Sequence, residues 1–166
     1  MPNTLTRYYL NEVKAESIAT RKCLERIPES VYDFKPHEKS MAMGYLVLLV
    51  AEIPKWISSI VEYSEIDFAT YKHSELSTTA ALLADYEANL KGAESALAKS
   101  RDEILDRQIF YLKNAGKELF QSPKLESIGS TINHWVHHRG QLTVYMRLNN
   151  IAVPSIYGPS ADDKSY

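Results

Sequence analysis

The sequence has little of what defines several large classes of protein. It contains one cysteine, Cys23, and six glycines among 166 residues. A single cysteine excludes an intrachain disulfide framework and a cysteine-rich zinc site. Glycine at roughly half its usual share argues against a turn-rich all-β fold. These absences point to a fold that is mainly helical.

Long hydrophobic runs are also missing. The first ten residues lack the apolar stretch of a secretory signal. The most apolar segment, 41–53, contains Glu52 and is followed by Pro54 and Lys55. It therefore falls short of the roughly 18–20 apolar residues of a membrane-spanning helix. We expect a buried helix here, no membrane partner and a cytoplasmic location.

Neither sign of charge dominates, with 19 basic against 21 acidic residues and a net charge of −2 when histidine is neutral. This balance creates no global field that would attract nucleic acid or an anionic membrane. We therefore expect no nucleic-acid partner. The length fits a single domain over residues 1–166.

Apolar residues recur at steps of three and four along four stretches, which is the period of a helix that buries one face. The predicted helices cover about residues 4–27, 40–63, 76–97 and 122–149. Candidate N-cap residues are Ser40, Ser77 or Thr78, and Ser122. Pro54 inside the second helix indicates a kink or a break.

The region 107–121 breaks this period, and its β-forming residues followed by a turn at Asn114–Gly116 predict a short hairpin. From about residue 151, prolines and a glycine predict an extended tail. Four helices with one apolar stripe each bury those stripes most economically in an all-α, antiparallel four-helix bundle. The connections on both sides of the third helix are long, so we expect at least one to cross over or to pack along a face.

Residues with metal-binding or catalytic chemistry concentrate in the last predicted helix, where three of the five histidines lie within 134–138. His134 and His138 are four residues apart, which places them about 40° apart around the axis and one turn along it. Both imidazoles can therefore reach one metal ion, whereas His137 points away. The same spacing also fits surface histidines, or core histidines that only hydrogen-bond. A stable zinc or nickel site needs a third ligand, in practice from a second helix.

The motifs around these histidines resemble those of a known family. Residues 133–142 read NHWVHHRGQL and are followed by 153–162, and upstream lie 34–41 and 51–56. In this order they are similar to the DinB-like (DinB/YfiT) superfamily of bacterial four-helix bundles, over about residues 5–162. The resemblance implies a bundle, often a homodimer, whose members hold a divalent metal by three histidines. It assigns the two ligands of the last helix to His134 and His138.

The third ligand of that family lies on the second helix, three residues before an acidic residue. Aligning Glu52 and Pro54 places that position at Leu49, and this helix contains no histidine. Because leucine cannot bind a metal, two alternatives remain open. Either the site binds a metal weakly or not at all, or a substitute ligand completes it. The candidate substitutes are Glu52, Tyr45, His37 and His73.

Two functional hypotheses follow from this departure. Members of the superfamily include metal-dependent thiol transferases and isomerases, in which the metal activates a bound thiol or polarises a carbonyl. The first hypothesis is such an enzyme, with zinc or nickel on His134 and His138 and a small-molecule thiol as co-substrate. The second is a non-catalytic bundle that binds a small apolar ligand or a protein partner. The retained histidines favour the first hypothesis, and Leu49 favours the second.

Overall fold

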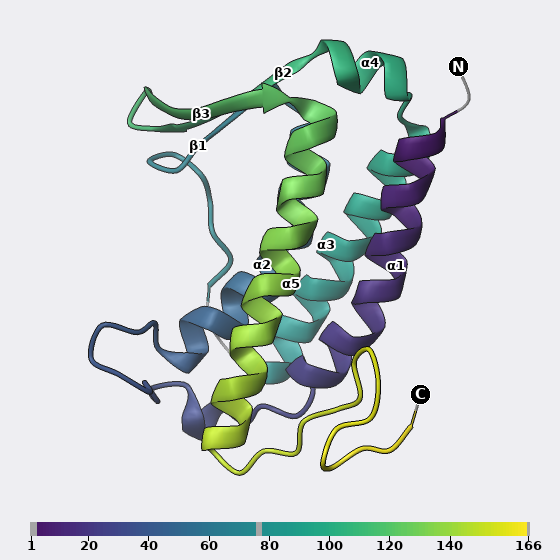
Figure 1. Ribbon diagram of the computed structural model, residues 1–166. Helices are drawn as coiled ribbons and strands as arrows, with labels where there is room; N and C mark the ends of the chain where they lie inside the picture. The colour runs from purple at the N-terminus through teal and green to yellow at the C-terminus, as the bar shows by residue number, and fades with distance from the viewer. Residues whose placement is uncertain (1–2, 76–77, 166) are drawn as a thin grey trace.

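The computed structural model describes residues 3–75 and 78–165, and four long helices form its body (Figure 1). They are α1 (Thr4–Leu24), α2 (Met43–Glu62), α3 (Thr79–Lys99) and α5 (Lys124–Leu148). The predicted four-helix bundle is confirmed. α2 packs against α3 and α5, and α1 packs against the same two helices. α1 and α2 therefore occupy opposite corners of the bundle.

The directions of the helices depart from a simple antiparallel bundle. Tyr32, which follows the short 3₁₀ helix η1 (Glu29–Val31), hydrogen-bonds to the starts of both α2 and α3, through Gly44 and Thr79. α2 and α3 therefore begin at the same end and run in the same direction. The antiparallel neighbours are α1 with α3 and α2 with α5. The expected crossover is the connection from α2 to α3, which returns along the length of the bundle (Figure 1).

A three-stranded sheet at one end of the bundle corrects the all-α prediction. Strands β2 (Ile109–Asn114) and β3 (Lys117–Pro123) form the predicted hairpin, with positive φ angles at Ala115 and Gly116 in its turn. β1 (Glu65–Asp67) was not predicted and pairs in parallel with β2. Its Asp67 carboxylate accepts hydrogen bonds from the backbone N–H groups of Ala115 and Gly116. A side chain that follows α2 thus holds the hairpin turn in place.

Pro54 lies inside α2 without ending it. Proline has no backbone N–H, so the carbonyl of Val50, four residues earlier, lacks its usual helical partner. The indole Nε1 of Trp135 on α5 donates to this carbonyl at 2.9 Å. The bond that proline removes from the helix is therefore replaced by one that ties α2 to α5.

α2 is the core helix, as predicted. By length and composition it could cross a membrane, but 61% of its most apolar window is buried inside the protein. Helix boundaries differ slightly from the predictions. α2 begins at Met43 rather than near Ser40, and α5 begins at Lys124, after Ser122. Thr78 caps α3 through Ala81 N, whereas Ser77 lies outside the described residues.

A carboxylate from a distant part of the chain caps the first helix. Asp102, at the start of the short helix α4 (Asp102–Arg107), accepts hydrogen bonds from the backbone N–H groups of Thr4, Leu5 and Thr6 and from the Thr6 hydroxyl. These N–H groups have no partner inside the helix, and their partial positive charge favours an anion. Asp102 thereby ties the end of α3 to the start of α1.

Asp102→Asn is expected to lower the free energy of unfolding by about 1 kcal/mol at neutral pH. Burial raises the pKa of Asp102, but the hydrogen bonds from Thr6, Leu5 and Thr4 together hold it below its ordinary value. A carboxyl group with a lowered pKa stabilises the fold above its unfolded pKa, and this contribution is lost as the pH falls through the folded pKa. Urea denaturation should therefore show a difference in the free energy of unfolding between the two proteins that is largest at neutral pH and disappears in acid. A difference that does not change with pH would rule out the charge of Asp102 as its cause.

Candidate functional site: a histidine pair beside an aromatic pocket

The structure brings His134 and His138 together on α5, as their spacing predicted. Their Nε2 atoms lie 2.7 Å apart, and the ring centroids are 4.5 Å apart. His138 is buried, and His134 is partly exposed. We refer to these two residues as the histidine pair. A nitrogen–nitrogen distance this short corresponds to one ring donating a hydrogen bond to the other.

A third residue continues this chain of hydrogen bonds. The Nδ1 atom of His138 lies 2.8 Å from Oε1 of Gln141, one turn further along α5. Burial lowers the pKa of His134, and its neighbours His138 and His137 lower it further. Burial and His137 also lower the pKa of His138, against the opposing effect of Gln141. Both rings are therefore neutral at neutral pH.

The wall opposite the histidine pair comes from α2. The Trp56 ring contacts the His134 ring, with centroids 5.6 Å apart. Trp135 and Tyr145 of α5 donate hydrogen bonds to the carbonyls of Val50 on α2 and of Met41, just before the start of α2. These bonds fix the position of α2 along the axis of α5. Measured along that axis, Leu49 lies within about one helical turn of His138. That Leu49 faces the histidine pair stays a prediction.

Glu52 is engaged elsewhere. Its Oε1 accepts from the Trp56 indole at 3.2 Å and lies 2.9 Å from Nδ1 of His73, and its Oε2 accepts from the backbone N–H of Ser74. His73 and Ser74 belong to the covering loop, residues 68–75, which lies against α2. Within that loop Tyr71 packs on Trp56, and its buried hydroxyl has no hydrogen-bond partner among the described residues. Glu52 thus anchors the covering loop.

The residues present do not fit a three-ligand metal site. Over residues 3–75 and 78–165, no group of three or more histidine, cysteine, aspartate or glutamate side chains is placed to hold a metal ion. Of the proposed substitutes, Glu52 and His73 bind each other, Tyr45 is exposed, and His37 accepts from the backbone N–H of Lys39. Two nitrogens bound at about 2.0–2.1 Å to one tetrahedral zinc lie roughly 3.3 Å apart, further than the histidine pair. Metal binding by the histidine pair stays a prediction.

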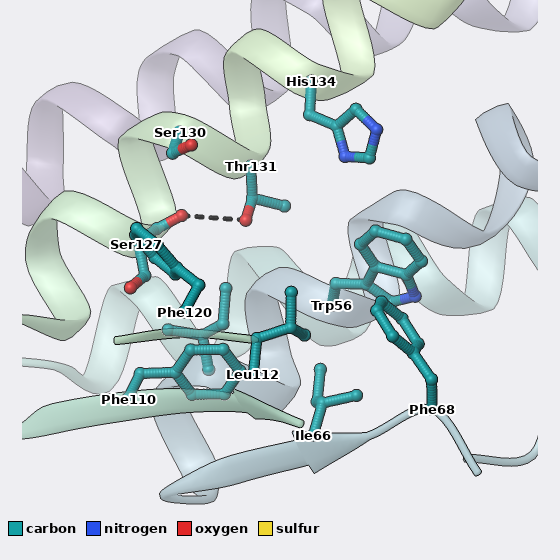
Figure 2. Close-up of a pocket in the computed structure, with 11 residues that line it drawn as sticks. Trp56, Ile66, Phe68, Phe110, Leu112, Phe120, Ser127, Ser130, Thr131 and His134 are labelled. Atoms are coloured by element: carbon teal, nitrogen blue, oxygen red, sulfur yellow. Dashed lines mark hydrogen bonds between the residues drawn. The ribbon is translucent and has the colours of Figure 1, made fainter. Parts of the chain in front are cut away.

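A cavity of about 330 Å³ lies beside the histidine pair, between the sheet and helices α2 and α5 (Figure 2). We call it the aromatic pocket. Its walls are mostly apolar, and its polar side chains come from α5, with His134 among them. The lining residues are Trp56, Ile60, Ile66, Phe68, Phe110, Leu112, Phe120, Ser127, Ser130, Thr131 and His134.

Sequence patterns did not predict the aromatic pocket, although they predicted the hairpin that forms one wall. Phe110 and Leu112 are two residues apart on β2, so they point to the same face of the sheet. Phe120 of β3 lies directly opposite Leu112. This alternation was a usable signal for an apolar sheet face. What covers that face depends on how the hairpin folds back onto α2 and α5, and neighbouring residues in the sequence do not determine that.

The fold is that of a DinB-like helical bundle. A DinB-like protein of Bacillus subtilis, YjoA, has a solved structure with a TM-score of 0.70 and 19% identity, covering 95% of this chain and 99% of that one. A DinB-like protein of Bacillus cereus ATCC 10987 has a TM-score of 0.64 and 21% identity, covering 90% and 95%. The protein described as "Uncharacterized protein YrdA" of Bacillus subtilis is 24% identical over 159 residues, which are 94% of this chain and 90% of that protein. The DinB family model matches residues 1–165, and the chain belongs to the DinB family.

Proposed function

We propose that this protein binds a small molecule with a largely apolar body in the aromatic pocket. The observation that carries the proposal is the pocket itself, about 330 Å³ in volume and walled by Trp56, Phe68, Phe110 and Phe120. Binding pockets for small molecules have volumes of about 300–1,000 Å³, apolar walls and a few polar groups. His134 supplies such a group.

The surroundings of the pocket support this function. Its walls come from helices and strands as well as the covering loop, so the cavity needs no folding step before it binds. Phe120 remains about half exposed at 48%, and burial of such apolar surface by a ligand is favourable at about 25 cal/mol per Å². An aromatic body of ten or eleven heavy atoms is expected to bind with a Kd of about 0.1 mM.

Ser130→Trp is expected to abolish binding of naphthalene. Ser130 lines the pocket and is exposed, so a large side chain there fills the cavity without disturbing the core. Ligand-observed NMR with naphthalene measures the effect. Val144→Trp is the matched control, since Val144 is also exposed on α5 but does not line the pocket. If the wild-type protein fails to bind naphthalene, or the Ser130 variant binds it as well as the control does, the proposal fails.

The converging Nε2 atoms of the histidine pair favour a second candidate, a zinc- or nickel-dependent enzyme that acts on a small-molecule thiol. In that case His134 and His138 hold the ion, and the metal lowers the pKa of the bound thiol. This candidate is weaker because Leu49 supplies no ligand and Glu52 is engaged by the covering loop. A homodimer and a cytoplasmic location stay predictions from the sequence.

A further inference from the structure

His134, on the wall of the aromatic pocket, has a ring nitrogen with no hydrogen-bond partner among the described residues. The Nε2 atom of His134 is hydrogen-bonded to His138, whereas Nδ1 has no hydrogen bond to any described residue. In Figure 2 this nitrogen lies on the side of the ring that faces Trp56 and Thr131. The inner wall of the pocket therefore presents a free imidazole nitrogen.

The buried hydroxyl groups of the pocket already have hydrogen-bond partners. The Thr131 hydroxyl donates to the Ser127 carbonyl at 2.8 Å (Figure 2). The Ser127 hydroxyl lies 2.6 Å from that of Ser122. The Ser130 hydroxyl has no hydrogen bond to a described residue, but it belongs to an exposed residue and is hydrated by solvent. Recognition of a polar group on the ligand therefore rests on His134 Nδ1.

The hydrogen-bond chain determines whether this nitrogen donates or accepts. Oε1 of Gln141 can only accept, so Nδ1 of His138 carries the proton and donates to it. A neutral imidazole has one N–H and one bare nitrogen. Nε2 of His138 is then bare and accepts from the N–H at Nε2 of His134. Nδ1 of His134 is left bare, as a hydrogen-bond acceptor that faces the pocket.

We infer that the aromatic pocket selects an aromatic molecule that carries one hydrogen-bond donor of the phenol type. This group donates a hydrogen bond to Nδ1 of His134. The inference rests on the proposed function and adds the polar half of the ligand. Gln141 acts as a positioning residue, because it fixes the tautomers of both histidines without touching the ligand. A ligand of the same shape without the donor leaves a partly buried acceptor unpaired, which costs about tenfold in affinity.

The test compares 2-naphthol, 2-methoxynaphthalene and naphthalene on chelator-treated protein, by isothermal titration calorimetry and ligand-observed NMR. 2-Naphthol is expected to bind about tenfold more tightly than the other two. If none of the three binds, the proposed function itself fails. If all three bind equally, the pocket stands and the inference about its polar specificity is overturned.

A variant of Gln141 tests the hydrogen-bond chain itself. In Gln141→Lys the side chain can only donate, so His138 Nδ1 must accept, both tautomers reverse, and His134 Nδ1 becomes a donor. The preference for 2-naphthol is expected to disappear, and nitrogen-15 NMR of the imidazoles should report the change of tautomer. Val144→Lys places the same charge three residues further along α5 and should keep the preference. A preference that survives in Gln141→Lys overturns the role assigned to Gln141.

Discussion

Arg139→Ala is expected to lower the free energy of unfolding by about 3–5 kcal/mol, the cost of removing one partner from a buried ion pair. Arg139 on α5 is 2% exposed, and its Nη2 lies 2.6 Å from Oε2 of Glu16 on α1. Its Nη1 also donates to the Glu16 carbonyl and to the Thr20 hydroxyl. Without the guanidinium, the Glu16 carboxylate stays buried with no cation to balance it.

The same ion pair holds the C-terminal tail, residues 151–165, against the bundle. The Tyr157 hydroxyl accepts from Arg139 at 2.7 Å and donates to the Glu16 carboxylate, and its ring lies over the guanidinium. Figure 1 shows the tail turning back beside the end of α1. Loss of Arg139 is therefore expected to release the tail as well, which faster proteolysis near the C-terminus would detect.

Urea denaturation followed by tryptophan fluorescence measures the loss of unfolding free energy in Arg139→Ala. Arg147→Ala is the matched control, because Arg147 lies on the same helix and binds Asp162 of the same tail but is half exposed. An exposed ion pair contributes about 0–1 kcal/mol. The double variant Glu16→Leu with Arg139→Met removes both charges and is expected to be more stable than Arg139→Ala. Equal losses for the two alanine variants would contradict a buried, charge-balanced pair.

Local sequence patterns predicted the features of this protein that depend on neighbouring residues. The recurrence of apolar residues every three and four positions predicted the four long helices, and Asn114–Gly116 predicted the hairpin turn. The spacing of four residues gave the contact between His134 and His138. Each of these depends on the backbone geometry of one helix or one turn, which nearby residues largely determine.

Features that depend on distant pairings were not predictable in the same way. Glu16, the partner of Arg139 in the buried ion pair, lies 123 residues away in the sequence. β1 is three residues long with Ile66 as its buried residue, too short an alternation to predict a strand, and it pairs with the edge of β2. Pro54 indicated a kink or a break, but α2 continues through it, and Trp135 satisfies the carbonyl that Pro54 leaves free.

Leu49→His is expected to increase zinc affinity by roughly a hundredfold or more. Structural zinc sites with four ligands bind with about 10–16 kcal/mol, or about 3 kcal/mol per ligand. The hydrogen bonds from Trp135 to Val50 and from Tyr145 to Met41 place residue 49 within about one turn of His138 along the helix axis. A histidine there would offer a third nitrogen to the histidine pair, whose rings would separate slightly to admit the ion.

Competition between tag-free protein and a chromophoric zinc chelator measures this affinity. Leu48→His is the matched control, since it adds the same side chain one residue earlier, about 100° around the axis of α2. Only the Leu49 variant should gain affinity, and His134→Ala in that background should remove the gain. Zinc should also raise the thermal midpoint of the Leu49 variant, because an ion that binds only the folded state stabilises it. Equal affinities for the two histidine variants would mean that residue 49 does not face the histidine pair. In the wild-type protein the histidine pair would then lack a third ligand because of the path of α2, and not because residue 49 is leucine.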